Sequence, residues 1–401
     1  MDEQHSKTAA PVAIARHGRQ KTPGSAWFVL KLLGVGLTVV AVSAASIVAI
    51  DTAAAFNRVP TFDLPNASDG PPPDIGAMPG GFNILLVGSD RGETEQEIKD
   101  RRGAELNDVT MILHVSGDHT RAVAVSIPRD TVVPIPSCPK KDGSGNHAAM
   151  AGQPINVTLS YGGVPCTILT VEALTGLHID FAGLITFQGV IQMSNALGGV
   201  PVCIAQDIND PASGFNRPAG TYVLSGSEAL AFLRARKHVG DGSDLARISS
   251  QQVFLSSMVR TLKSEDTLND PVKLYSIAQA AVTNMELSSN FRNTDTLFSI
   301  ARALSTLELD QVMFVQYPGS TNNPGIYLNK VKPDAAVASQ LFSKILADEP
   351  FALAPTDPSL GSVVDPNATP DPAVTSDPSV EVIAGLPGQT AATQTCSKGS
   401  K

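Results

Sequence analysis

LSGSEALAFLRARKHVGDGSDLARISSQQVFLSSMVR, residues 224–260, is the stretch around which the rest of the chain is organised. Its apolar residues recur with helical spacing on both sides of Gly240 and Gly242, which predicts two helices joined by a glycine-containing turn. Ser225 followed by Glu228 is a capping-box pattern, so we expect the first helix to begin at Ser225.

The same stretch concentrates arginine, the side chain that binds phosphate through a planar fork of donors. Arg247 and Gln251 are four residues apart and share one face of the second helix, which Asp244 is placed to cap. Arg234 and Arg236 face the same way only if the first helix ends between them. The pattern indicates an anion site. Composition alone leaves a salt-bridged surface pair of helices equally open.

Composition limits the class of protein. The chain has 401 residues, of which 42% are hydrophobic and 17% charged, with a net charge of −9. This length allows one large domain or two modest ones. The acidic balance argues against nucleic acid as a partner, because no basic surface is available to follow phosphates. Motifs of P-loop kinases, zinc hydrolases and lipases are absent from the sequence.

The N-terminal region predicts a membrane anchor. Residues 1–26 are polar and basic, and no charge occurs from Leu32 to Ile50. That run reaches about 28 Å as a helix, close to the thickness of a bilayer core. We expect residues 27–50 to form a single-pass signal-anchor helix in the cell membrane, with a cytoplasmic N-terminus and an extracytoplasmic domain. A cleavable signal peptide is the alternative.

The remainder divides by composition into three parts. Residues 51–80 are rich in proline and glycine and are expected to be a linker. A folded domain is expected over residues 81–350. Residues 351–401 repeat Asp-Pro pairs among small polar residues, which predicts disorder.

All four cysteines follow the anchor, which fits an oxidising compartment. Their spacing matches no zinc site. Cys138 and Cys166 flank one loop-rich stretch and are the favoured disulfide pair, while Cys203 and Cys396 are the remaining candidates. Buried free thiols are the alternative.

Acidic and basic side chains lie at or beside the ends of the first predicted strands, 82–87, 109–115 and 121–127, of which the last two form a hairpin. Ligand sites are commonly built at strand ends in sheets covered by helices. Paired carboxylates near arginines suit a hard divalent cation together with phosphate. Each aspartate taken alone is better explained as a turn residue. The candidates are Asp90, Asp108, Arg129 and Asp130.

A dense apolar set over residues 179–193 includes Phe181 and Phe187. Its pattern favours a hydrophobic core. The sharper alternative is the wall of a lipid-accepting pocket, which suits a domain tethered to a membrane.

Six motifs in order make the chain resemble the LytR-CpsA-Psr family of cell-wall glycopolymer phosphotransferases, in the style of members from mycolata-type actinobacteria. They are LLVGSDRG at 85–92, NDVTMILHV at 107–115, VSIPRDT at 125–131, INVTLSYGG at 155–163, ALGGV at 196–200, and LSGSEALAFLRARKHVGDGSDLARISSQQ at 224–252. The resemblance implies a three-layer α/β/α domain with a central mixed sheet.

The resemblance also implies an activity. Family members transfer a glycopolymer from a polyprenyl-diphosphate carrier to peptidoglycan through a phosphodiester, and the glycopolymer here would be arabinogalactan. The family places Mg²⁺ (or Mn²⁺) on Asp90 and Asp108, and the lipid in an apolar tunnel whose candidate wall residues here are Phe181 and Phe187. Arg129, Arg234, Arg236 and Arg247 would bind the diphosphate, supported by Gln251. Asp244 would orient an arginine or act near the incoming hydroxyl, and Asp130 belongs to the same catalytic set.

Two positions depart from the family pattern. Leu106 and Val133 stand where some members carry additional arginines.

Two other functions fit the same candidate site residues. One is a phosphatase acting on polyprenyl diphosphate, with water as acceptor, and the other is a non-catalytic, membrane-tethered binder of wall polymer or lipid. A binder would need the arginines but not both metal-binding aspartates.

Overall fold

The computed structural model describes residues 59–65, 81–90, 105–292, 294–354, 360–368 and 380–400. The expected cytoplasmic segment and the expected anchor lie outside these ranges. Within them, one helical segment, Ile155–Thr175, is long and apolar enough to span a membrane. Half of that segment is buried inside the domain, where it serves as a core helix.

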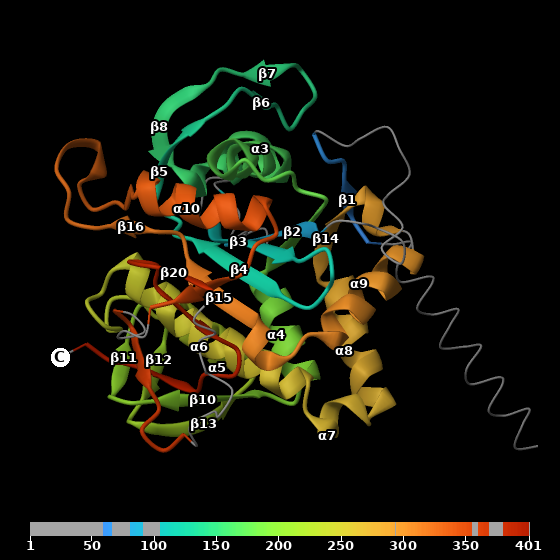
Figure 1. The fold of residues 1–401 in the computed structure, drawn as a ribbon, viewed down its shortest axis with the longest axis vertical. Helices are drawn as coiled ribbons and strands as arrows, with labels where there is room; N and C mark the ends of the chain where they lie inside the picture. The colour runs from blue at the N-terminus through green and yellow to red at the C-terminus, as the bar shows by residue number, and fades with distance from the viewer. Residues whose placement is uncertain are drawn as a thin grey trace, which may run out of the picture. The chain divides into compact units, whose positions relative to one another are not determined.

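A mixed sheet of eight strands forms the centre of the domain (Figure 1). The pairs β1–β14, β2–β9 and β4–β15 are parallel, and the other neighbouring pairs are antiparallel. The hairpin expected between the second and third strands is β3–β4. In sheet order the strands are β1 (Thr61–Phe62), β14 (Met285–Ser288), β9 (Phe181–Thr186), β2 (Phe82–Ser89), β3 (Asn107–Val115), β4 (Ala122–Ile127), β15 (Val312–Gln316) and β21 (Gly388–Thr390).

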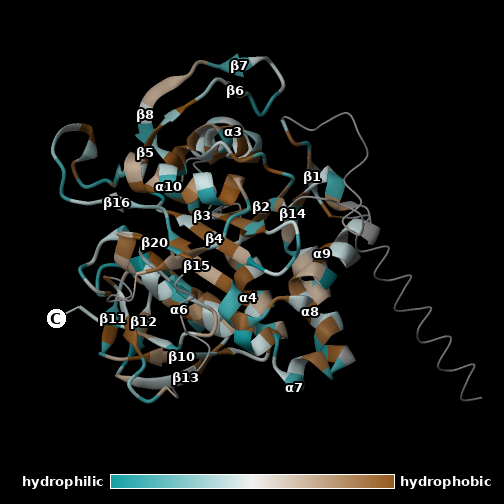
Figure 2. Cartoon of the chain, viewed as in Figure 1, coloured by the Kyte–Doolittle hydropathy of each residue, from teal (hydrophilic) through white to brown (hydrophobic). Residues whose placement is uncertain are grey.

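Helices cover both faces of this sheet. Alternate residues of β2 point to opposite sides, so Leu85 and Val87 pack towards α3 (Thr158–Thr175) and α10 (Ala335–Leu346). Ile84 packs on the other side towards α6 (Asp244–Leu262) and α9 (Thr294–Thr306). The strands at the centre are accordingly coloured as hydrophobic in Figure 2. This is the three-layer arrangement expected from the sequence.

A smaller sheet, β13-β10-β22-β19, encloses a third core against α5 and α6. Short strands and helices complete the domain. They are β5 (Val132–Ile135), β6 (Cys138–Pro139), β7 (Asn146–His147), β8 (Met150–Pro154), α4 (Phe187–Ala196), β10 (Val200–Ile204), β11 (Ile208–Asp210), β12 (Phe215–Arg217), β13 (Gly220–Leu224), α5 (Gly226–Arg234), α7 (Glu265–Leu268), α8 (Pro271–Thr283), β16 (Gly319–Ser320), β17 (Lys332–Pro333), β18 (Phe351–Leu353), β19 (Ser362–Val364), β20 (Glu381–Ile383) and β22 (Thr395–Ser397).

The C-terminal region differs from the disordered tail expected for residues 351–401. Residues 360–368 and 380–400 supply β19 to β22, and β21 extends the central sheet as the neighbour of β15. The composition predicted disorder because the segment has few apolar residues. Those few, among them Ile383 and Ala391, are buried against the domain, and the strands also pair through their backbones, as β19 does with β22. The linker differs in the same way, because β1 lies within it and pairs with β14.

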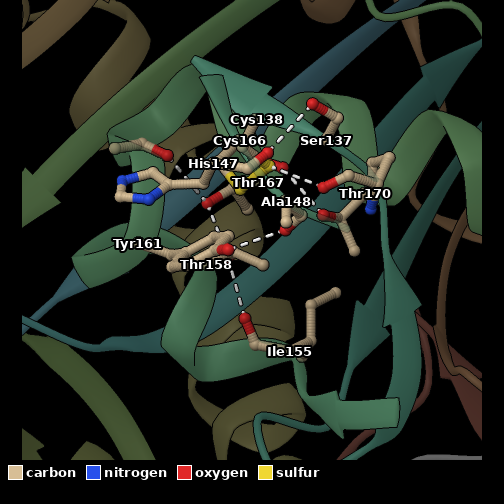
Figure 3. Close-up of a disulfide and its surroundings, with 12 residues drawn as sticks. Ser137, Cys138, His147, Ala148, Ile155, Thr158, Tyr161, Cys166, Thr167 and Thr170 are labelled. Atoms are coloured by element: carbon tan, nitrogen blue, oxygen red, sulfur yellow. Dashed lines mark hydrogen bonds between the residues drawn. A yellow bond between two sulfur atoms is a disulfide. The ribbon is translucent and has the colours of Figure 1, made fainter. Parts of the chain in front are cut away.

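Two disulfides connect the four cysteines. Cys138 and Cys166, the pair favoured by the sequence, lie at the start of the β6–β7 hairpin and on α3 (Figure 3). Beside them the ring of His147 stacks on Tyr161, with 4.2 Å between ring centroids. The second bridge joins Cys203 of β10 to Cys396 of β22. It ties the C-terminal strand to the body of the domain.

Candidate active site

The turn between α5 and α6 sets the direction of two arginines. Helix α5 ends at Arg234, and Ala235 is extended. The helix therefore ends between Arg234 and Arg236, as expected from the sequence. The Oδ2 atom of Asp210 accepts hydrogen bonds from the backbone N–H groups of Arg236 at 2.7 Å and of Lys237 at 3.1 Å. Burial raises the pKa of Asp210, but these backbone donors outweigh it and the net pKa is lowered. A buried carboxylate therefore holds the arginine-bearing turn.

The helix starts differ in detail from the sequence expectation. Ser225 is the N-cap of α5, but its side chain makes no capping hydrogen bond. Ser243, rather than Asp244, caps α6, and its Oγ accepts from the N–H of Ala246 at 3.1 Å. Asp244 is instead the first residue of the helix, and its side chain is directed into a cluster of charged groups.

That cluster joins α6 to the ends of β3 and β4. The carboxylate of Asp108 pairs with the Nη1 atom of Arg129. The Oδ1 atom of Asp244 lies 2.8 Å from Nη2 of Arg247 and 3.9 Å from Nε of Arg129. Burial disfavours the charged form of Arg129, but Asp108 and then Asp244 outweigh it, so the pKa of its guanidinium is raised. These carboxylates therefore favour the charged form of Arg129.

Asp130 bridges two further cations. One of its oxygens lies 3.1 Å from Nη2 of Arg236, and the other lies 3.1 Å from Nζ of Lys330. Both carboxylate oxygens of Asp130 are thus engaged by cations, and the residue positions Arg236. Lys330 was not predicted from the sequence, and neither was Asp210. Asp210 occurs in an Asn-Asp-Pro turn, and Lys330 lies in a polar loop far along the chain.

A cavity of about 590 Å³ adjoins the cluster, and the four predicted arginines, Asp108 and Gln251 are all among its lining residues. The other lining side chains are mostly apolar and come from the sheet and from α4, α5 and α6, which lie on the same side of it (Figure 1). They include Phe187, Val190, Met193, Phe254, Met258 and Met285.

The two candidate phenylalanines take different places. Phe187 lines the cavity, and its ring supports the guanidinium of Arg234 at 4.7 Å from the ring centroid. Phe181 is 0% exposed and packs against Phe82 and Phe291 in the core, so it does not line the cavity. The difference follows from register, because Phe181 lies at the start of β9 and Phe187 begins the helix that follows it.

The candidate metal ligands lie at one end of the β2–β3 pair. The backbone N–H of Asp90 donates to Leu106, and the Oδ1 atom of Asp90 accepts from the N–H of Leu106 at 2.8 Å. Asp108, two residues after Leu106, is the second residue of β3. Both residues carry carboxylates, the hard oxygen ligands that Mg²⁺ and Mn²⁺ prefer, and the Asp108 carboxylate is paired here with Arg129.

The structure shows the surroundings of Leu106 and Val133, the two positions that depart from the family pattern. Leu106 provides the backbone contact that holds Asp90. Val133 is 1% exposed in the main core, where a charged side chain would lack solvation. Lys330 supplies an additional cation near the arginines.

Comparison with known proteins gives a consistent picture. The model of the LytR_cpsA_psr family matches residues 51–342. The chain is 32% identical over 270 residues to the cell wall biosynthesis protein LcpA of Corynebacterium glutamicum, covering 61% of this chain and 51% of LcpA. It is 27% identical over 256 residues to TagT of Bacillus subtilis, a polyisoprenyl-teichoic acid–peptidoglycan teichoic acid transferase, covering 62% of this chain and 72% of TagT.

The chain therefore spans about half the length of LcpA. Among solved structures, that of TagV from B. subtilis superposes with a TM-score of 0.53 and 24% identity, covering 68% of this chain and 99% of TagV. At this identity the likeness shows a shared fold.

Proposed function

The chain belongs to the LytR_cpsA_psr family, and on that premise we propose that it transfers a glycopolymer from a polyprenyl-diphosphate carrier to peptidoglycan through a phosphodiester bond. The names of two relatives support this proposal, since TagT is a teichoic acid transferase acting on peptidoglycan and LcpA is a cell wall biosynthesis protein. We further propose that arabinogalactan is the glycopolymer, because LcpA comes from an actinobacterium and the motifs resemble members from that group.

One observation carries the proposal: a single cavity combines an extended apolar lining with four arginines. A polyprenyl chain needs apolar contacts to leave the membrane, and its diphosphate needs cations. Arginine is suited to that task because its donors match phosphate oxygens in pairs. A water-soluble phosphorylated substrate would leave the apolar part of the cavity without a role.

The chemistry follows from this placement. A hydroxyl oxygen of the acceptor attacks the phosphorus that carries the sugar, and a new P–O bond forms. The bond from that phosphorus to the bridging oxygen breaks, polyprenyl phosphate leaves, and the hydroxyl proton passes to a carboxylate of the site. Phosphoryl transfer depends mainly on charge neutralisation and alignment, which Arg129, Arg234, Arg236 and Arg247 provide. A Mg²⁺ or Mn²⁺ ion held by Asp90 and Asp108 would neutralise further charge on the diphosphate.

The test uses the full chain in membranes with a lipid-linked glycan, Mg²⁺ and peptidoglycan fragments, and mass spectrometry of the fragments. We expect a phosphodiester-linked product. Arg234→Ala should reduce its rate by about 10- to 100-fold, the effect of losing charge-assisted hydrogen bonds. Arg217→Ala is the matched control, because that guanidinium also lies over a ring, Tyr222 at 5.2 Å, but does not line the cavity.

Other outcomes would contradict the proposal in distinct ways. Release of polyprenyl phosphate into water, without attachment at any acceptor concentration, would identify a phosphatase. Lipid binding that Arg234→Ala abolishes, with no turnover in the unchanged chain, would identify a binder.

A further inference from the structure

The loop of residues 325–331 is fixed to the candidate site by its own backbone. It lies between β16 and β17, and Figure 1 shows it projecting beside β5 and β8. The N–H of Val331 donates to the carbonyl of Asp130 at 3.0 Å, and the N–H of Val132 donates to the carbonyl of Val331 at 3.1 Å. The base of the loop is therefore held directly after Arg129.

Lys330 connects this loop to a cavity-lining arginine. Its Nζ lies 3.1 Å from Asp130, whose other oxygen binds Arg236. Arg236 lines the cavity, whereas Asp130 and Lys330 do not. The side chain of Lys330 is 34% exposed. Lys330 thus reaches a predicted diphosphate contact, Arg236, through Asp130, while its own side chain remains in contact with solvent.

The outer surface of the loop combines apolar and polar groups. Ile326 and Leu328 are each 66% exposed, and Asn329 beside them is exposed as well. Sugar rings present C–H faces, which apolar side chains cover, and hydroxyls, which amides and ammonium groups bind. We propose that the 325–331 loop binds the acceptor polysaccharide, with Lys330 as a positioning residue that places an acceptor hydroxyl beside Arg236. This inference rests on the function proposed above.

A polysaccharide fits this surface better than a membrane does. The lipid of the donor already has an apolar cavity, and the acceptor must reach phosphorus from outside it. The two exposed aliphatic residues are flanked in sequence by Asn322, Asn329 and Lys330, whose polar groups would lose hydration in an acyl layer.

The experiment measures transfer by the full chain in membranes, with saturating lipid-linked glycan and varied soluble peptidoglycan strands. Lys330→Ala and the double variant Ile326→Ser/Leu328→Ser should each raise the KM for the strands about tenfold, and the KM for the donor should stay within about twofold. Lys330→Arg should restore most of the loss. Lys344→Ala is the control, since Lys344 forms salt bridges at 2.8 Å to Glu349 and Glu381 on another part of the domain.

Two results would overturn the inference. One is an unchanged KM for the strands in both variants, and the other is a parallel loss of donor affinity, which would make Lys330 part of the diphosphate site. Weaker binding of the double variant to lipid vesicles, with normal acceptor kinetics, would assign the loop to the membrane instead. Failure of the proposed function itself looks different, because the unchanged chain would then form no phosphodiester product.

Discussion

At the scale of single residues, Asp244 is the most consequential carboxylate of the site. It is 2% exposed and lies beside Arg129 and Arg247. Removing one member of a buried charge group leaves the others uncompensated. We predict that Asp244→Asn lowers the free energy of unfolding by about 3 kcal/mol. Urea denaturation of residues 55–401, which form one compact unit, measures the change. Asp142→Asn, at an exposed turn, is the control, and equal midpoints for both variants would contradict the prediction.

Residue chemistry also explains which site residues the sequence predicted. Arg234, Arg236 and Arg247 fall within one short stretch, so local spacing was enough to group them. Asp210 and Lys330 reach the same place from elsewhere in the chain, and nothing local marks them as neighbours of Arg236. Phe181 shows the opposite error: its apolar pattern favoured a core, where it lies, but the resemblance led to its inclusion among the wall residues of the lipid pocket.

At the scale of elements, the periodicity of apolar residues predicted the helices and strands of the domain interior well. Strand β2 and helix α6 follow their apolar patterns closely, because both lie in the interior of the domain, where apolar residues are buried. Helix α3 contains non-helical geometry at Gly162 and Gly163, so its first turn and its main part are separate helical segments. Chain ends were the weak point: β1 and β19 to β22 are short strands whose partners are distant in sequence.

The β2–β3 pair carries a pH-dependent contribution to stability. His114 of β3 contacts Asn83 of β2 at 2.9 Å and lies 3.8 Å from Asp348. Burial lowers the pKa of His114 below 6.5, although Asp348 opposes the shift. The unfolded chain therefore binds more protons in the window just below pH 6.5, and this part of the stability is lost as pH falls through it.

We predict that the free energy of unfolding of residues 55–401 decreases from pH 7.5 to pH 5.5, and that His114→Gln makes this dependence shallower. Gln retains a hydrogen-bonding group but does not titrate. Urea denaturation at both pH values measures the difference. An identical slope in the variant would assign the pH dependence to other groups.

At the scale of the whole molecule, the C-terminal segment acts as part of the site's support. The N–H of Gly240 donates to Lys398 at 2.8 Å, and the N–H of Ser400 donates to His238 at 3.0 Å. Both contacts fall on the turn that follows Arg236. Ser397 also lies 2.6 Å from Ser250 within α6. The segment and Asp210 thus both hold the arginine-bearing turn, through separate backbone hydrogen bonds.

Truncation after Leu353 tests this role. It removes β21 from the edge of the central sheet, β22 from β10, and the disulfide partner of Cys203. We predict that Tm falls by about 10 °C, because several buried apolar side chains are lost together with the pairings of β21 with β15, β22 with β10 and β20 with β18. Donor affinity should also fall, since Arg236 lies on the released turn. Thermal unfolding and equilibrium binding of a lipid-linked glycan measure the two effects.

The control separates loss of the segment from a break in the chain. A protease site introduced between residues 370 and 379 leaves residues 380–400 attached through Cys203–Cys396 after cleavage. The cleaved protein should keep the Tm and donor affinity of the intact chain until a reductant is added, and should then approach the truncated form. If the truncated and intact chains share one Tm and one donor affinity, the C-terminal strands contribute to neither the fold nor the site.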